Sequence, residues 1–170
     1  MFLKTTLTTL TFSLSSLAFA GPGHSDDHDS DQEPSFNAGQ PGREHYVDRI
    51  IDVEASDQMR FISDDWAVQP GETVRFVVTN TGQLPHEFVI DTAQGNAVHR
   101  KSMMETMANG DMMAHDDPNA VAVAPGETSE LIWTFTDAGT FEAACNLPGH
   151  YEAGMSIDIA VTNDTFAQTN

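Results

Sequence analysis

The only cysteine of the chain, Cys145, is followed at regular spacing by a histidine and a methionine. Four residues separate Cys145 from His150, and four separate His150 from Met155, while His86 lies far upstream. Two imidazoles, one thiolate and one thioether form the ligand set of a trigonal copper site with a long axial methionine bond. Soft sulfur suits Cu(I) and imidazole suits both oxidation states. These four residues therefore predict a mononuclear type 1 copper site that supports electron transfer.

Other chemistries of the same residue types are less well supported. Zinc is the competing metal, but a thioether is a poor zinc ligand and the set has no further cysteine or acid. A cysteine protease needs histidine and asparagine or aspartate around an activated thiolate, whereas Cys145 follows an apolar run. A satisfied core histidine and a buried inert thiol are the structural alternatives. We expect a metal-binding redox protein rather than an enzyme, with no catalytic residues.

The elements that would position these ligands are short β-strands. Residues 74–78 have large apolar side chains at every second position, which is typical of a half-buried strand. About eight strand segments, separated by turn residues and with little helix, predict an all-β, Greek-key β-sandwich. Cys145 ends one predicted strand and Met155 begins the next, so the loop between them could wrap around one ion. The predicted segments are residues 50–53, 66–68, 74–78, 86–91, 121–124, 131–135, 141–145 and 155–161.

A methionine-rich segment, residues 94–118, interrupts this strand pattern. Residues 96–108 contain reasonable helix formers and no proline, and Asn109-Gly110 is a plausible stop. We predict an inserted helix followed by a loop. A long excursion of this kind in a compact domain usually has a function or is disordered.

The methionines of this insertion suggest a second metal site. On a helix, His99, Met103 and Met107 recur at four-residue steps and would share a face. Thioethers with imidazole favour Cu(I), which gives the hypothesis of a weaker Cu(I) site formed by these residues and His115. The alternative is that the face packs on the sandwich, with methionine as an adaptable filler.

The first 20 residues have the pattern of a secretory signal peptide. Lys4 supplies a positive charge, residues 7–17 are moderately apolar, and Ala18-Phe19-Ala20 is a small-x-small cleavage site. We therefore predict export, with cleavage after Ala20.

The rest of the chain is predicted to comprise a leader, one domain and a tail. Residues 21–44 are rich in histidine, acids and proline, with almost no large apolar residue, so we expect disorder. Such a leader could bind divalent metal loosely, although a merely solvated leader is the simpler interpretation. Residues 45–162 would form the domain, and residues 163–170 a C-terminal tail.

Composition restricts the partners. The chain has 26 acidic against 7 basic residues and a formal net charge of -19, which argues against binding to nucleic acid. The single cysteine excludes an internal disulfide, and no stretch reaches the roughly 20 apolar residues of a membrane span. A redox partner with a basic docking surface is expected.

Several motifs of the chain resemble the cupredoxins, the blue-copper proteins that include plastocyanin, azurin, rusticyanin and auracyanin. The pattern is most similar to the CopI-type periplasmic cupredoxins of bacterial copper tolerance, and by this resemblance His86, Cys145, His150 and Met155 are copper ligands. Plastocyanin and azurin usually have asparagine after the first histidine ligand, whereas Glu87 stands here and lacks the amide donor. The motifs are Met59-Arg60-Phe61, Gly71-Glu72-Thr73-Val74-Arg75-Phe76, His86-Glu87, His115-Asp116-Asp117-Pro118-Asn119 and Leu147-Pro148-Gly149-His150.

The resemblance implies a periplasmic, redox-active copper protein that contributes to copper tolerance. A dedicated electron carrier of a respiratory chain is the alternative, although such a carrier does not need additional Cu(I) ligands. A cuprous oxidase is less favoured, because the sequence has no second histidine-rich set for a multinuclear centre.

Overall fold

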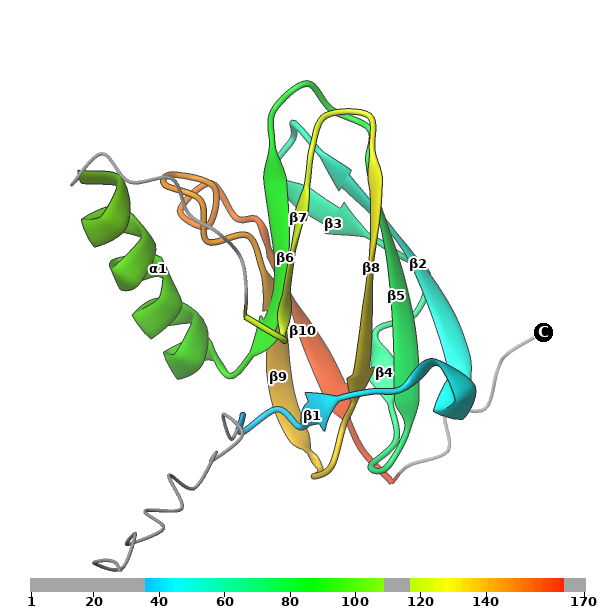
Figure 1. Cartoon of the computed structure of the whole chain (residues 1–170). Helices are drawn as coiled ribbons and strands as arrows, with labels where there is room; N and C mark the ends of the chain where they lie inside the picture. Colours follow the sequence, from blue (N-terminus) through cyan, green and yellow to red (C-terminus); the bar gives the residue numbers. More distant parts are fainter. Residues whose placement is uncertain (1–35, 109–116, 164–170) are drawn as a thin grey trace, which may run out of the picture. The chain divides into compact units, whose positions relative to one another are not determined.

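Two five-stranded β-sheets pack against each other in the computed structural model of the chain, which describes residues 36–108 and 117–163 (Figure 1). These residues belong to one unit, Glu33–Asn170. The predicted all-β sandwich with an inserted helix is confirmed. Within the described residues, no helix is both long and apolar enough to cross a membrane.

The first sheet has the strand order β1-β8-β5-β2-β3. Its central strands β5 and β2 run parallel, with Phe76 opposite Ile51, and β8 runs antiparallel to β5. A short 3-10 helix, Glu44–Tyr46, follows β1. The strands are β1 (Gln40–Pro41), β2 (Arg49–Ser56), β3 (Arg60–Ile62), β5 (Thr73–Asn80) and β8 (Thr128–Thr134).

The second sheet has the strand order β4-β10-β9-β6-β7. Its strands pair antiparallel except for β4, which runs parallel to β10. The one α-helix in the described residues, α1 (Ala93–Ala108), joins β6 to the chain before β7 and contacts β6 and β9. The strands are β4 (Ala67–Val68), β6 (His86–Asp91), β7 (Ala120–Val123), β9 (Gly139–Ala144) and β10 (Ser156–Val161).

The core lies between the sheets, and β6 is buried on both faces. Phe88 of β6 faces the first sheet, with its ring centroid 5.3 Å from that of Phe76. Side chains alternate between faces along a strand, so Glu87 and Val89 point the other way, and both are fully or almost fully buried. The inserted helix α1 covers that outer face (Figure 1).

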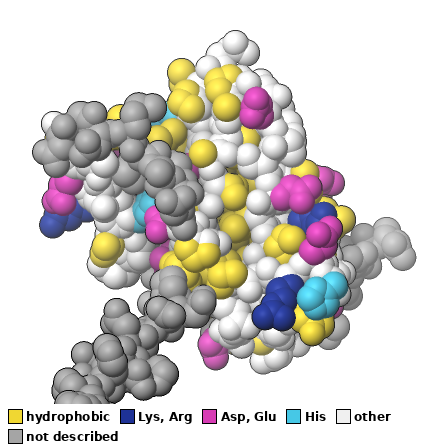
Figure 2. Space-filling view, in the orientation of Figure 1, with side chains coloured by type: hydrophobic (Ala, Val, Ile, Leu, Met, Phe, Trp, Pro, Cys, Tyr) yellow, Lys and Arg dark blue, Asp and Glu magenta, His cyan; other side chains and the backbone are white. Residues whose placement is uncertain are grey.

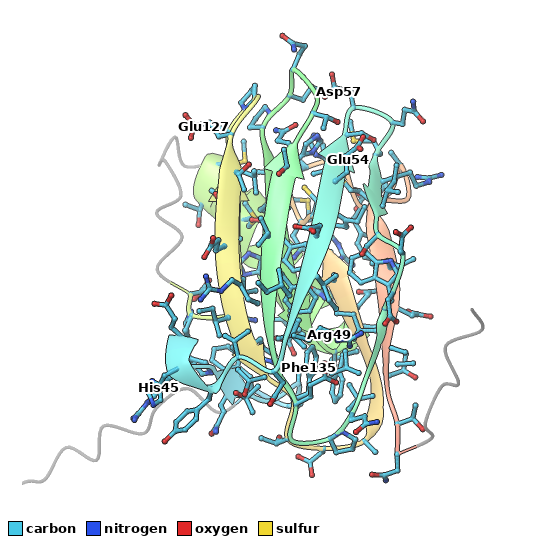
Figure 3. The ribbon with its side chains drawn as sticks, turned by 90° about the vertical axis from the view of Figure 1, so that its right-hand side faces the viewer. His45, Arg49, Glu54, Asp57, Glu127 and Phe135 are labelled. Carbon is cyan, nitrogen blue, oxygen red and sulfur yellow. The ribbon has the colours of Figure 1, made fainter. Side chains whose placement is uncertain are left out.

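The two ends of the sandwich carry different residues. Figure 3 shows Asp57 and Glu127 near one end and Arg49 and Phe135 near the other. Asp57 lies between β2 and β3, and its carboxylate accepts hydrogen bonds from the backbone N–H groups of Gln83 and Leu84, just before β6. The start of β6 therefore lies at the Asp57 end.

The prediction that residues 21–44 are disordered is wrong for residues 36–44. Phe36 packs edge-on against Trp133 at 5.4 Å between ring centroids, and β1 pairs with β8. Ala38 is fully buried, and its carbonyl accepts a hydrogen bond of 3.0 Å from the indole N–H of Trp133. A buried indole needs such an acceptor, which fixes this part of the leader on the sheet. The domain thus begins before the predicted residue 45, and residues 21–35 lie outside the described residues.

The predicted helix is present, but it begins at Ala93 rather than Asn96. Thr92 caps it, because its hydroxyl oxygen accepts a hydrogen bond of 3.0 Å from the Gly95 backbone N–H. The predicted stop at Asn109-Gly110 lies outside the described residues. So do the predicted signal peptide and residues 164–170 of the predicted tail.

Candidate metal centre

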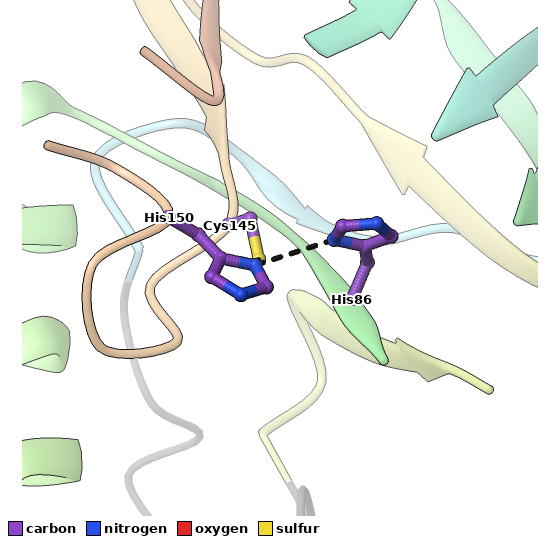
Figure 4. A group of neighbouring side chains, drawn as sticks. All are labelled: His86, Cys145 and His150. Atoms are coloured by element: carbon purple, nitrogen blue, oxygen red, sulfur yellow. Dashed lines mark hydrogen bonds between the residues drawn. The ribbon is translucent and has the colours of Figure 1, made fainter. Parts of the chain in front are cut away.

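Three of the four predicted ligands meet at one end of the second sheet. His86 begins β6, Cys145 directly follows β9, and His150 lies in the loop between β9 and β10. One ligand atom from each side chain lies within 4.8 Å of those of the other two (Figure 4). The His150 Nδ1 atom is 3.3 Å from Cys145 Sγ and 3.3 Å from His86 Nδ1. Among the described residues, this is the one group of at least three His, Cys, Asp or Glu side chains with metal-binding spacing.

A tight turn presents His150 to this cluster. The His150 backbone N–H donates a hydrogen bond of 3.0 Å to the Leu147 carbonyl, and Gly149 has a φ of 87°. Proline at the second position, a positive φ at the third and this hydrogen bond define a type II turn. The Leu147-Pro148-Gly149-His150 motif therefore has a structural reason, since only glycine adopts that φ without strain.

Met155, the fourth predicted ligand, is fully buried just before β10 and shares the hydrophobic core cluster with Cys145. The Cys145 backbone N–H donates to the Met155 carbonyl at 3.0 Å, and the Met155 N–H donates to the His150 carbonyl at 3.0 Å. The backbone thus ties Met155 to two members of the cluster. Its role as the axial ligand stays a prediction.

Burial governs the chemistry of the cysteine. Desolvation raises the pKa of the Cys145 thiol to about 12, although the backbone N–H groups of Glu87 and Leu147 act in the opposite direction. The Glu87 N–H lies 3.4 Å from Sγ. A thiol with so high a pKa is not an activated nucleophile, so a cysteine protease does not fit. A cation that binds the thiolate directly can displace the proton, and this donor set fits copper.

The two imidazoles are suited to act as neutral ligands. Burial lowers the pKa of His86, the neighbouring His150 lowers it further, and Asp57 opposes both effects. Burial likewise lowers the pKa of His150. While His86 Nδ1 faces the cluster, its Nε2 atom lies 3.7 Å from Asp57 Oδ1. A carboxylate behind the second ring nitrogen commonly orients a metal-bound histidine.

Glu87 connects the two strands that carry His86 and Cys145. Its side chain is fully buried, and its Oε1 atom accepts a hydrogen bond of 2.7 Å from the Asn146 backbone N–H. A carboxylate cannot donate as an asparagine amide does, but at this position it acts as an acceptor. The His99 Nε2 atom lies 3.6 Å from the same Oε1, and the contact with Glu87 is the main cause that raises the pKa of His99.

The described residues contain three of the four members of the predicted second Cu(I) site, His99, Met103 and Met107. His99 lies between two acids. Its Nε2 atom faces Glu87, and its Nδ1 atom is 3.5 Å from Asp117 Oδ2. Met103 is fully buried, whereas Met107 is 50% exposed, and His115 lies outside the described residues. The burial of Met103 agrees with packing of α1 on the sheet, and the second site stays a prediction.

Sequence reasoning missed the residues around the ligands. Asp57 and Arg100 carry no motif, and their contacts join residues far apart in the chain. The Arg100 Nη1 atom donates to Asn146 Oδ1 at 3.0 Å, and the guanidinium lies 3.5 Å from the ring centroid of Tyr151. The one available signal was that Asn146 and Tyr151 directly follow two predicted ligands.

Comparisons with known proteins agree with this geometry. Residues 48–162 match the family model described as copper binding proteins, plastocyanin/azurin family. The copper-resistant cuproprotein CopI of Rubrivivax gelatinosus is 44% identical over 135 residues, which cover 79% of this chain and 78% of that protein. CopI of Pseudomonas aeruginosa is 41% identical, over 69% of this chain and 78% of that protein.

Solved structures show the same fold at lower identity. Auracyanin B has a TM-score of 0.58 and 22% identity, over 74% of this chain and 96% of its own. Reduced auracyanin from Roseiflexus castenholzii has a TM-score of 0.54 and 22% identity, over 67% of this chain and 96% of its own. At this identity the likeness concerns the fold alone.

Proposed function

The chain belongs to the plastocyanin/azurin family of copper-binding proteins, and we propose that His86, Cys145 and His150 hold one redox-active copper ion. The observation that carries this proposal is the convergence of their ligand atoms within 4.8 Å at one end of the second sheet. When bound, copper supplies one-electron chemistry between Cu(I) and Cu(II). Met155 would supply its thioether as a fourth, weaker ligand.

The residues of the chain hold this set in a fixed geometry. Cys145 would bind as a thiolate after losing its proton, and the Glu87 backbone N–H is directed at the sulfur. His86 and His150 would bind through their Nδ1 atoms, which lie 3.3 Å apart. Ligands supplied by strand ends and a hydrogen-bonded loop reorganise little, which suits electron transfer.

Electrons are proposed to enter and leave at the His150 end. His150 is half-buried, whereas His86 and Cys145 are buried. Leu84, which is 44% exposed, precedes His86 by two residues, and Pro148 is exposed in the ligand loop. An apolar surface of this kind can dock a partner. The net charge of -19 and the excess of acidic side chains on the face in Figure 2 favour a basic partner.

The cellular role that we propose is copper tolerance in the periplasm. Two relatives at more than 40% identity are named copper-resistant cuproproteins, and the first 20 residues have the pattern of an export signal. We propose no enzymatic activity. A respiratory electron carrier remains the second candidate, because the same site would serve it.

The copper site is tested by adding Cu(II) to the purified protein and recording absorption and EPR spectra. We expect an intense thiolate-to-copper band with one strongly bound copper per chain, and its loss in Cys145→Ser. His150→Gln should weaken binding strongly. The matched control is His45→Gln, which removes an exposed imidazole outside the cluster. Absence of the band in the unmodified protein, or its persistence in Cys145→Ser, would refute the site.

The cellular role is tested in a strain that lacks the gene. We expect growth inhibition at lower copper concentrations and restoration by the unmodified gene but not by the Cys145→Ser gene. Impaired respiration without copper sensitivity would instead support the respiratory carrier. Cell fractionation and N-terminal sequencing test the export proposal, with Gly21 as the expected first residue.

A further inference from the structure

Helix α1 contacts the residue that directly follows each of the three converging ligands. His99 contacts Glu87, which follows His86. Arg100 contacts both Asn146, which follows Cys145, and Tyr151, which follows His150. All three contacts come from adjacent positions on one helix. We propose that α1 is a positioning element for the copper site, acting through His99 and Arg100, an inference that rests on the copper site proposed above.

The first contact acts on the strand that carries His86. Glu87 uses both its backbone and its side chain at the site, because its N–H lies 3.4 Å from Cys145 Sγ and its Oε1 accepts the Asn146 N–H at 2.7 Å. His99 faces this fully buried carboxylate at 3.6 Å. A buried carboxylate without a compensating charge is costly. His99 therefore keeps the Glu87 side chain in the position that joins β6 to the Cys145 loop.

The second contact acts on the loop that carries His150. The Arg100 side chain is only 16% exposed, and it both donates to Asn146 Oδ1 at 3.0 Å and stacks on the Tyr151 ring at 3.5 Å. A planar guanidinium can make these two contacts at once, and lysine cannot reproduce them. Arg100 thus links the two residues that flank the turn that places His150.

A hydrogen-bonded frame around Arg100 supports the same loop. The Asn146 side-chain amide donates to Asn96 Oδ1 at 2.9 Å, and the Asn96 amide donates to the Glu142 carbonyl at 3.2 Å. The Tyr151 hydroxyl donates to Glu142 Oε1 at 2.9 Å. Asn96 is fully buried, so these bonds are shielded from water. The ligand loop is therefore fastened from β9 on one side and from α1 on the other.

The test compares Arg100→Met and His99→Gln with Lys101→Met. Lys101 is the next residue on α1, its side chain is 75% exposed, and within the described part of the chain its one ion pair is with Glu105, on the same helix. Its substitution removes a positive charge from the same helix without touching the ligand loop. Methionine at position 100 keeps much of the apolar stem of arginine. If Arg100→Met does not fold, Arg100→Lys replaces it under the same criteria.

The first readout uses the copper-free protein and therefore does not depend on the proposed function. In Arg100→Met, we expect the backbone amides of His150 and Met155 to exchange hydrogen at least about tenfold faster. This is the effect of losing one charge-assisted hydrogen bond. In His99→Gln, the Asn146 amide should show the same acceleration. Lys101→Met should leave all three amides unchanged. Equal exchange in all variants would overturn the proposal.

The second readout uses the copper-loaded protein. Substitution of residues that orient metal ligands commonly lowers metal affinity by 10–100-fold. We expect about a tenfold loss of copper affinity in Arg100→Met and in His99→Gln. The EPR spectrum and the reduction potential should also change, whereas Lys101→Met should match the unmodified protein. Changes that merely follow the loss of global stability, or that also occur in Lys101→Met, would overturn the positioning role. If the unmodified protein itself shows no thiolate-to-copper band, the proposed function fails, while the exchange measurement still tests the hold of α1 on the loop.

Discussion

Replacing Met155 by leucine separates its proposed role as a ligand from its role in the core. The side chain is fully buried and belongs to the hydrophobic cluster, so a structural explanation of its position is available. Methionine and leucine have similar volumes, and such swaps usually cost less than about 1.5 kcal/mol of unfolding free energy. Met155→Ala would instead leave a cavity and cost about 2–5 kcal/mol. Leucine therefore removes the thioether and keeps most of the packing.

We expect Met155→Leu to keep the thiolate-to-copper band, because Cys145 and both imidazoles remain. The reduction potential should shift, because the leucine side chain offers no sulfur to either oxidation state. A tenfold change in the ratio of the Cu(II) and Cu(I) affinities corresponds to about 59 mV for a one-electron couple, and we expect a shift of that order. Urea unfolding of the copper-free protein and redox titration of the loaded protein measure the two effects.

The matched control is Met103→Leu, which makes the same change at an equally buried methionine of α1, outside the proposed copper site. It should lower the unfolding free energy by a similarly small amount and leave the potential unchanged. If Met155→Leu shifts the potential no more than Met103→Leu does, Met155 is a core residue and the axial assignment is wrong.

Three further predictions concern the surroundings of the site and the start of the domain. Asp57→Asn should weaken copper binding by about tenfold in competition titrations, because Asp57 stands behind His86 Nε2; an unchanged affinity would contradict this orienting role. His99 has a pKa raised above 6.5, mainly by Glu87, so its contribution to stability is complete below pH 6.5 and is lost as the pH rises through the folded-state pKa. The difference in unfolding free energy between the unmodified copper-free protein and His99→Gln should therefore shrink at alkaline pH, and a constant difference would speak against the ion pair. The charged groups that face His99 are Glu87, Asp91 and Asp117. Gly39→Ala should lower the free energy of unfolding in urea by about 1–3 kcal/mol. Gly39 has a φ of 129°, and a Cβ there would overlap the Thr134 carbonyl oxygen. A neutral effect would mean that the pairing of β1 with β8 adds nothing to stability.

The sequence predicted those parts of the fold whose pattern is local. The alternation in residues 74–78 corresponds to β5, in which Val74, Phe76 and Val78 are buried. Strands β1 and β3 have only two and three residues, too few to show a period. The sequence places residues 36–44 in the predicted leader because average composition hides a single aromatic residue. Phe36 becomes ordered through its contact with Trp133, almost one hundred positions away, and no local pattern reports such a contact.

The copper ligands could be predicted because their chemistry and spacing are local in the sequence. The residues that position them could not, because their roles depend on contacts between distant parts of the chain. Cys145 and His150 lie in one loop with a fixed spacing, and thiolate with imidazole restricts the choice of metal. Asp57 and Arg100 carry common side chains, and their roles depend on how β6, α1 and the ligand loop are arranged in space. Glu87 stands where plastocyanin and azurin usually have asparagine, and its chemical type alone indicates a lost hydrogen-bond donor. The fold instead supplies a donor, the Asn146 backbone N–H, to which a carboxylate is the suitable partner.

The acceptor at position 87 also gives a reason for the inserted helix. An asparagine at this position would be neutral and could stay buried without a counter-charge, whereas the fully buried Glu87 needs one. His99 supplies it from α1, and the adjacent Arg100 reaches the ligand loop from the same turn of helix. The carboxylate and the helix therefore depend on each other. A double-mutant cycle tests this dependence. The Glu87→Gln background removes the need for a counter-charge, so His99→Gln should have little further effect on copper affinity there. Two fully additive effects would show that the helix and the carboxylate act independently.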